Sequence, residues 1–209
     1  MDVFEAIAKR RSIRKYQDKD VDDKLIGVLL WAAAQAPSAG NLQEWRFIVV
    51  RDKKTKEMLC NAALKQEHVR QAPVLIIVAA DLEVQSLRYG KRGELVYSLE
   101  DCAAAIENML LAATALGLGT CWVGAFDEND VKNILRLPDF LRPIAIITVG
   151  YPDEEPEKKE VDYSRFAFLE YYGRKFEFEF KTLHELIMEK VEKIREFIAK
   201  KQNKKMVVR

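Results

Sequence analysis

The sequence predicts a layered domain of the α+β or α/β class, built around one sheet. Helical and strand patterns alternate along residues 1–150, and the strand pattern at residues 73–80 is apolar throughout, as in a strand covered on both faces. The chain of 209 residues is long enough for one ordinary core, or for two small domains. No internal repeat and no second core are visible, so we expect a single sheet.

The first half of the chain begins with a capping box. Asp2 and Glu5 predict the start of a short amphipathic helix that ends near Arg10 or Arg11. The spacing that follows predicts a helix from Asp22 or Asp23 to Pro37, a strand over residues 46–51, a helix over 52–64 and the apolar strand over 73–80. We expect the last of these strands to be central in the sheet.

The second half contains a helix that is apolar nearly all round, over residues 97–116, and it must lie in the core or at a subunit interface. Two strands and a helix follow, over residues 120–124, 143–150 and 127–135. Residues 151–162 are a charged connector. Beyond it, FEFEF at residues 176–180 alternates as an edge strand does, and Thr182 opens an amphipathic helix.

Composition removes several classes of function. The 34 Lys and Arg residues nearly balance the 33 Asp and Glu residues, so no overall charge favours nucleic acid. Three cysteines without a CxxC pair and two distant histidines argue against a disulfide framework and a metal site. No signal peptide, membrane span, GxGxxG or P-loop pattern is present. These features predict a cytoplasmic protein that binds neither nucleic acid nor membrane.

Three segments contain residues suited to binding a ligand. Arg10, Ser12 and Arg14 alternate, so in an extended segment they would converge on a phosphate; alternatively, the arginines only complement a helix end. Residues 37–45 combine small residues with amides that suit a heterocycle, or else form a simple turn. At Gly124 and Ala125 the backbone amides could face a ring nitrogen, or these residues merely end a strand.

Taken together, four segments resemble the nitroreductase family of FMN-dependent oxidoreductases, in the order and spacing of that family. They are RRSIRKY at 10–16, APSAGNLQEWRFIVV at 36–50, EDCAAAIENMLLAATALGLGTCWVGAF at 100–126 and ITVGYP at 147–152. Glu44 departs from the resemblance, because the family commonly has proline there. The family's late basic phosphate ligand is represented only by Lys158 and Lys159.

The resemblance implies an α+β, three-layer fold, with a central mixed, mostly antiparallel sheet flanked by helices. It implies a homodimer with two FMN sites at the subunit interface, in which a C-terminal strand is exchanged between the subunits. We expect residues 1–175 to form the FMN-binding domain, and residues 176–209 to form a strand and helix that pack on the dimer.

The resemblance also implies the cofactor contacts. Those to the phosphate and the pyrimidine edge of FMN come from Arg10, Arg11, Ser12 and Arg14, with Lys158 or Lys159; those from the partner subunit come from Pro37, Ser38 and Asn41; and those near the ring come from Gln66, Gly124 and Ala125. No side chain is expected to be catalytic, because the backbone of Gly124 and Ala125 supports flavin N5.

These implications lead to one function. We expect tightly bound FMN, NADH or NADPH as co-substrate, and a ping-pong transfer of hydride to a small acceptor such as a nitroaromatic or a quinone. Two alternatives stay open. One is a flavin-fragmenting, dehalogenating or dehydrogenase member of the same fold, and the other is a flavin-binding protein without turnover.

Overall fold

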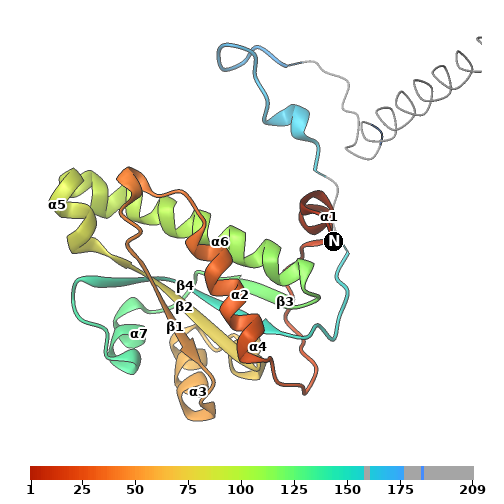
Figure 1. The fold of residues 1–209 in the computed structure, drawn as a ribbon, viewed down its shortest axis with the longest axis vertical. Helices are drawn as coiled ribbons and strands as arrows, with labels where there is room; N and C mark the ends of the chain where they lie inside the picture. Colours follow the sequence, from red (N-terminus) through yellow and green to blue (C-terminus); the bar gives the residue numbers. More distant parts are fainter. Residues whose placement is uncertain (158–160, 177–184, 186–209) are drawn as a thin grey trace, which may run out of the picture. The chain divides into compact units, whose positions relative to one another are not determined.

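A computed structural model describes residues 1–157, 161–176 and 185. The chain divides into two compact units, Met1–Lys158 and Lys159–Arg209. In the first unit the elements are, in order, α1 (Val3–Lys9), α2 (Asp23–Ala34), the 3₁₀ turn η1 (Ala39–Asn41), β1 (Trp45–Val50), α3 (Lys53–Ala62), α4 (Glu67–Gln71), β2 (Val74–Asp81), α5 (Leu82–Arg92), the π-helical segment η2 (Gly93–Tyr97), α6 (Ser98–Ala115), β3 (Gly119–Val123), α7 (Glu128–Leu135) and β4 (Leu141–Gly150) (Figure 1). The second unit contains the 3₁₀ turn η3 (Tyr163–Arg165).

The four strands form one sheet in the order β1-β2-β4-β3, and all three ladders are antiparallel. A parallel bridge between Ser12 and Thr120 adds the segment after α1 to the β3 edge. Every residue of β2 is buried, which confirms that this strand is central. Helices combined with a mostly antiparallel sheet confirm the α+β class.

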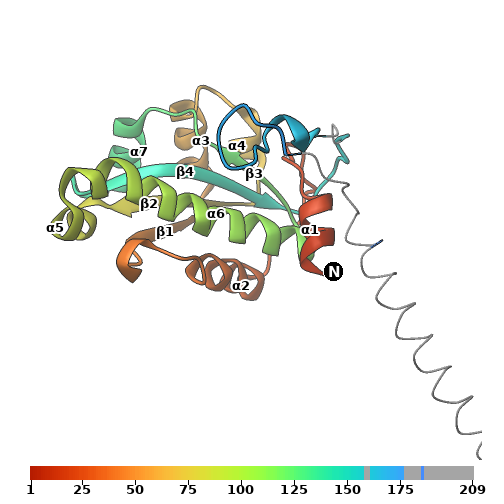
Figure 2. The same cartoon turned by 90° about the horizontal axis from the view of Figure 1, so that it is seen from above.

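Helices cover both faces of the sheet, which makes three layers. Because side chains alternate along β2, Ile76 and Val78 face a core that includes α2 and α6, whereas Leu75 and Ile77 face a core that includes α3, α4 and α7. Figure 2 shows α2 on one side of the sheet and α3 and α7 on the other. The apolar helix predicted over residues 97–116 is α6, and its buried row lies in the first of these cores.

Aspartates begin most of the helices, as the sequence predicts. The capping box of α1 is present, and the side chains of Asp22, Asp52 and Asp127 cap α2, α3 and α7. Predicted bounds differ from the observed ones by at most three residues. The prediction lacks α4, α5 and η2. The FEFEF strand and the helix from Thr182 lie outside the described residues, apart from Phe176 and Glu185. Phe176 donates its backbone N–H to the Ala167 carbonyl (3.2 Å).

Candidate functional site at the β3 edge

The segment after α1 runs in extended form along β3. The Ile13 N–H donates to the Thr120 carbonyl (2.8 Å), so Ser12 and Arg14 flank a fixed point of the sheet edge. The Ser12 hydroxyl is within hydrogen-bond reach of the Cys121 thiol, and Arg14 is exposed. Residues 12 and 14 therefore present a hydroxyl and a guanidinium on the same edge, as the alternation predicts.

Arg10 and Arg11, which precede Ser12, have different partners. The Nε atom of Arg10 pairs with Glu107 of α6 (3.3 Å), and both side chains remain partly exposed. Arg11 turns back on α1, where its Nη1 donates to the carbonyls of Ala8 (2.7 Å) and Arg10 (2.8 Å). The interpretation as a helix-end cation therefore fits Arg11, whose Nε is buried and has no partner among the described residues.

Gln66 and the end of β3 meet directly. The Gln66 amide Nε2 donates to the carbonyls of Ala125 (3.1 Å) and Ala63 (3.0 Å). Gly124 is exposed, and a Cβ atom placed on it would find only Trp122 Nε1 nearby, at 3.8 Å. The backbone at Gly124 and Ala125 is thus open to a flat ligand, with an amide side chain beside it.

His68 lies near the same edge, and no sequence pattern indicates a role for it. The imidazole is 8% exposed, and its Nε2 has no hydrogen-bond partner in the described part of the chain. Burial lowers the pKa of His68, and the nearby charge of Arg14 lowers it further, whereas Glu154 opposes the shift. A neutral imidazole therefore lies near Arg14. Burial raises the pKa of Cys121, which keeps this thiol protonated.

The loop of residues 37–43 lies against α5 and the start of α6, away from Gln66 and the end of β3. The Ser38 Oγ accepts the Gln43 N–H (3.0 Å), and Asn41 Oδ1 accepts from the Gln43 amide (3.3 Å). Asn41 has a positive φ of 57°, a conformation that asparagine tolerates. Pro37 is exposed.

Two helices fix this loop. The Ala39 N–H donates to both carboxylate oxygens of Asp101 on α6 (3.0 and 2.9 Å), and Arg88 Nη1 of α5 donates to the Gly40 carbonyl (3.2 Å).

The arginine segment and this loop are at opposite ends of α6. Asp101, near the helix start, contacts the loop, whereas Thr114, near its end, shares a cavity of about 460 Å³ with Arg11 and Ile13. The 18 residues of α6 span about 27 Å, and Figure 1 shows α5 and α1 at its two ends. The contacts of the loop and of Arg11 with α6 are 13 residues apart, about 20 Å, whereas the Arg10 side chain reaches back to Glu107, six residues from Asp101. Lys158 and Lys159 lie outside the described residues.

Comparison with known proteins identifies the scaffold. Residues 7–66 and 59–151 match the family model described as the nitroreductase family. The chain belongs to the nitroreductase family. As a member of this family it is an oxidoreductase, and the sequence prediction of the family is confirmed.

Proteins similar to this nitroreductase-family chain are named as dehydrogenases or reductases. An NADH dehydrogenase of Thermus thermophilus is 36% identical over 182 residues, which cover 74% of this chain and 89% of the relative. An FMN reductase (NAD(P)H) of Bacillus subtilis is 29% identical over 171 residues, 76% of this chain and 69% of that one. The structure of NfrA2 from B. megaterium superimposes with a TM-score of 0.75 at 26% identity, over 97% of this chain and 85% of the other.

Two further observations concern the described residues only. No group of three or more His, Cys, Asp or Glu side chains among them could hold a metal ion. No helix among them combines the length and the apolar character that crossing a membrane requires.

Proposed function

We propose that this nitroreductase-family chain is an FMN-dependent NAD(P)H oxidoreductase whose flavin lies along the β3 edge. One observation carries the proposal. Ser12, Gln66 and Ala125 come from three separate segments, and hydrogen bonds place all three along β3 and its end. A strand edge with open backbone, an amide and nearby arginines is what a flat, phosphorylated heterocycle requires.

The donors present fit FMN. Guanidinium groups of Arg10 and Arg14, with the Ser12 hydroxyl, would hold the phosphate, because guanidinium pairs well with phosphate oxygens. Arg11 adds positive charge beside them, although its guanidinium is occupied by the end of α1. At the other end, the backbone of Gly124 and Ala125 would face the ring, and Gln66 would lie beside them.

The chemistry that bound FMN supplies is ping-pong transfer of hydride from NADH or NADPH, at flavin N5, to an acceptor such as a nitroaromatic or a quinone. The chain's own residues bind and orient. Backbone amides at Gly124 and Ala125 would stabilise charge beside N5 without a catalytic side chain. Open space at Gly124 leaves room for the nicotinamide and the acceptor in turn. The proposal places this reaction in the cytoplasm, where NAD(P)H is available and the three free cysteines stay reduced.

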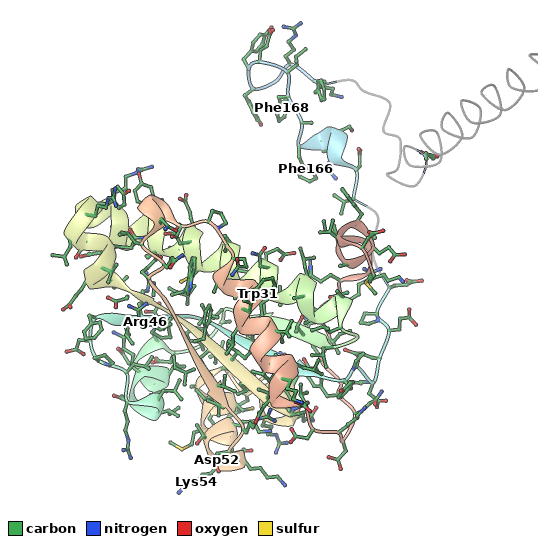
Figure 3. The ribbon with its side chains drawn as sticks, in the orientation of Figure 1. Trp31, Arg46, Asp52, Lys54, Phe166 and Phe168 are labelled. Atoms are coloured by element: carbon green, nitrogen blue, oxygen red, sulfur yellow. The ribbon has the colours of Figure 1, made fainter. Side chains whose placement is uncertain are left out.

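The proposal includes a homodimer. The loop and the Arg11 cavity contact α6 at Asp101 and at Thr114, about 20 Å apart, so Pro37, Ser38 and Asn41 would reach the flavin held by a second copy of the chain. Lys158 or Lys159 would add a cation to the phosphate. Exposed apolar side chains support a second subunit; Trp31 on α2, labelled in Figure 3, is 64% exposed.

The experiment that tests this function is anaerobic mixing of the purified, FMN-loaded protein with NADH and, separately, with NADPH. Loss of the flavin absorbance, followed by its return when a quinone or nitroaromatic is added, is the expected result. A yellow protein that neither nicotinamide bleaches would be a flavin-binding protein without this turnover. Bleaching without reoxidation by these acceptors would instead indicate one of the other chemistries of the fold.

A further inference from the structure

A buried acid lies behind the loop of residues 37–43. Glu44 is 0% exposed, and neither of its carboxylate oxygens has a hydrogen-bond partner among the described residues. Its neighbours are Gln85 of α5, also 0% exposed, and Asp101 of α6, 7% exposed. An unpaired buried carboxylate is costly, so this cluster requires an explanation.

The hydrogen bonds of the cluster lack one donor. Asp101 accepts from the Ala39 N–H at 3.0 and 2.9 Å and from Gln85 Nε2 at 2.8 Å. The Gln85 Oε1 atom is an acceptor and is itself unpaired. Glu44 therefore lies beside the Asp101 carboxylate, which can only accept, and beside the Gln85 amide, whose Nε2 already donates to Asp101. A proton on Glu44 would turn one of its oxygens into the missing donor.

We propose that Glu44 is a positioning residue that is protonated at mildly acidic pH, donates that proton to the Asp101 carboxylate beside Gln85, and thereby fixes the loop that carries Ser38 and Asn41. The inference rests on the proposed function in one respect, namely that this loop contacts the flavin of the partner subunit. The link from acid to loop is direct, because the same Asp101 carboxylate holds the Ala39 N–H.

The electrostatic surroundings agree. Burial, and after it the charge of Asp101, raise the pKa of Glu44 to about 7. On α6, the Cys102 thiol faces the pair, and burial raises its pKa, so it adds no charge. On the strand side, the Asp81 N–H donates to the Glu44 carbonyl (3.0 Å), but the Asp81 carboxylate already pairs with Arg46 (2.8 Å), which Figure 3 labels near β1.

Ionisation of Glu44 has a defined consequence. Once the proton is lost, two adjacent carboxylates repel each other at a buried place, and Asp101 can lower that repulsion only by moving away from Glu44. Such a movement strains or breaks the bonds to Ala39. Rising pH should therefore loosen the loop, weaken FMN binding and lower the stability of the protein.

The test measures the FMN dissociation constant by fluorescence titration, from about pH 5.5 to about pH 8.5, for the wild type and Glu44→Gln. The glutamine amide supplies a donor at every pH, so its binding should lack the loss that Glu44 causes. We expect wild-type affinity to fall about tenfold relative to Glu44→Gln across this range. Because both proteins bind the same phosphate, titration of FMN itself cancels in this ratio. Glu83→Gln, an exposed position on α5, is the matched control and should follow the wild type.

Thermal unfolding of the FMN-free proteins over the same pH range gives a readout that does not depend on the flavin. The wild type should lose thermal stability as pH rises, and Glu44→Gln should lose less. If Glu44→Gln does not fold, Asp101→Asn replaces it, and removal of the like charge should shrink the wild-type slope. The inference would be overturned if FMN affinity and thermal stability changed with pH equally in the wild type and in the variant.

If the proposed function is wrong, the same measurements give a different result. In that case the wild type does not bind FMN at any pH, while the difference in unfolding still reports the proton on Glu44. Wild-type FMN binding with equal pH slopes in both proteins would leave the proposed function intact and remove the role of Glu44.

Discussion

At the scale of single residues, the arginines of the β3 edge allow a sharp test. Charged hydrogen bonds contribute about 1.5 to 3 kcal/mol each, so Arg10→Ala with Arg14→Ala should weaken FMN binding by at least about a hundredfold. The fold should survive, because the Arg10–Glu107 pair is partly exposed and such pairs stabilise little. Equilibrium titration with FMN measures the effect.

The matched control removes two exposed cations elsewhere, Lys53→Ala with Lys54→Ala, at the start of α3. It lowers the net charge equally and should bind FMN as the wild type does. An equal loss in both double variants would assign the effect to overall charge, and no loss in either would contradict the phosphate assignment.

A second prediction at this scale concerns the effect of His68 on stability at acidic pH. Burial and then Arg14 lower its pKa below the ordinary value of 6.5, so the unfolded chain binds a proton before the folded one does. Stability should consequently fall as pH drops below about 6.5, and continue to fall until the folded pKa is reached. His68→Gln should remove that part of the acid-side loss, as measured by denaturant unfolding of the FMN-free protein.

The slope against pH is the readout for His68, since the substitution also changes packing. Glu44 acts in the opposite direction over part of this range and is present in both proteins, so it cancels in the comparison. An unchanged slope in His68→Gln would mean that the imidazole does not titrate differently on folding.

These residues also show which parts of the site could be predicted from the sequence. Arg10, Ser12 and Arg14 were recognisable, because their alternation is local. Glu44 was visible only as a departure from a family pattern, and His68 not at all. Glu44 is buried beside Gln85 of α5 and Asp101 of α6, and His68 is buried near Arg14 and Glu154. Spacing along the chain carries no record of such contacts.

At the scale of elements, Gly119 at the start of β3 fixes how closely the arginine segment approaches. A Cβ atom on Gly119 would lie 2.9 Å from the side chain of Ile13, which is closer than carbon atoms tolerate. Gly119→Ala should therefore displace Ile13 and its neighbour Ser12, lower stability by about 1 to 3 kcal/mol and weaken FMN binding. Thermal unfolding and FMN titration measure the two effects.

Gly27→Ala is the control for the same change. Nothing lies within 4 Å of a Cβ atom there, and the position is inside α2, so it should gain about 0.5 to 1 kcal/mol. A Gly119→Ala protein that binds FMN normally would show that the close contact with Ile13 does not position the phosphate ligands.

The elements that the sequence predicted were those with strong local signals. Aspartate caps and the apolar run of β2 identified most helices and the central strand. The prediction lacked α4, which has five residues, too few for a periodic pattern. It also lacked α5, which buries few residues and which Gly90 interrupts with a positive φ of 55°. That helix is held by contacts with the loop after α2, which only the fold reveals.

At the scale of the whole molecule, the separation along α6 bears on the proposed homodimer. Asp101, which holds the loop of Ser38 and Asn41, and Thr114, which lines a cavity with Arg11, are about 20 Å apart along α6. This separation supports the proposal that two chains share each flavin. A two-fold dimer allows this sharing in a symmetric way, since each chain then supplies the arginines of one site and the loop of the other. Strong dilution should accordingly cost FMN together with the dimer.

Complementation between two defective chains tests this sharing directly. Arg10→Ala with Arg14→Ala disables the arginine half of both sites, and Ser38→Ala with Asn41→Ala disables the loop half. When the two variants are unfolded together and refolded, each mixed dimer contains one site with both defects and one with none. Random pairing should restore high-affinity FMN binding to about one quarter of all sites. A site built within one chain would regain none, and FMN titration of the mixture against each refolded variant alone separates the two outcomes.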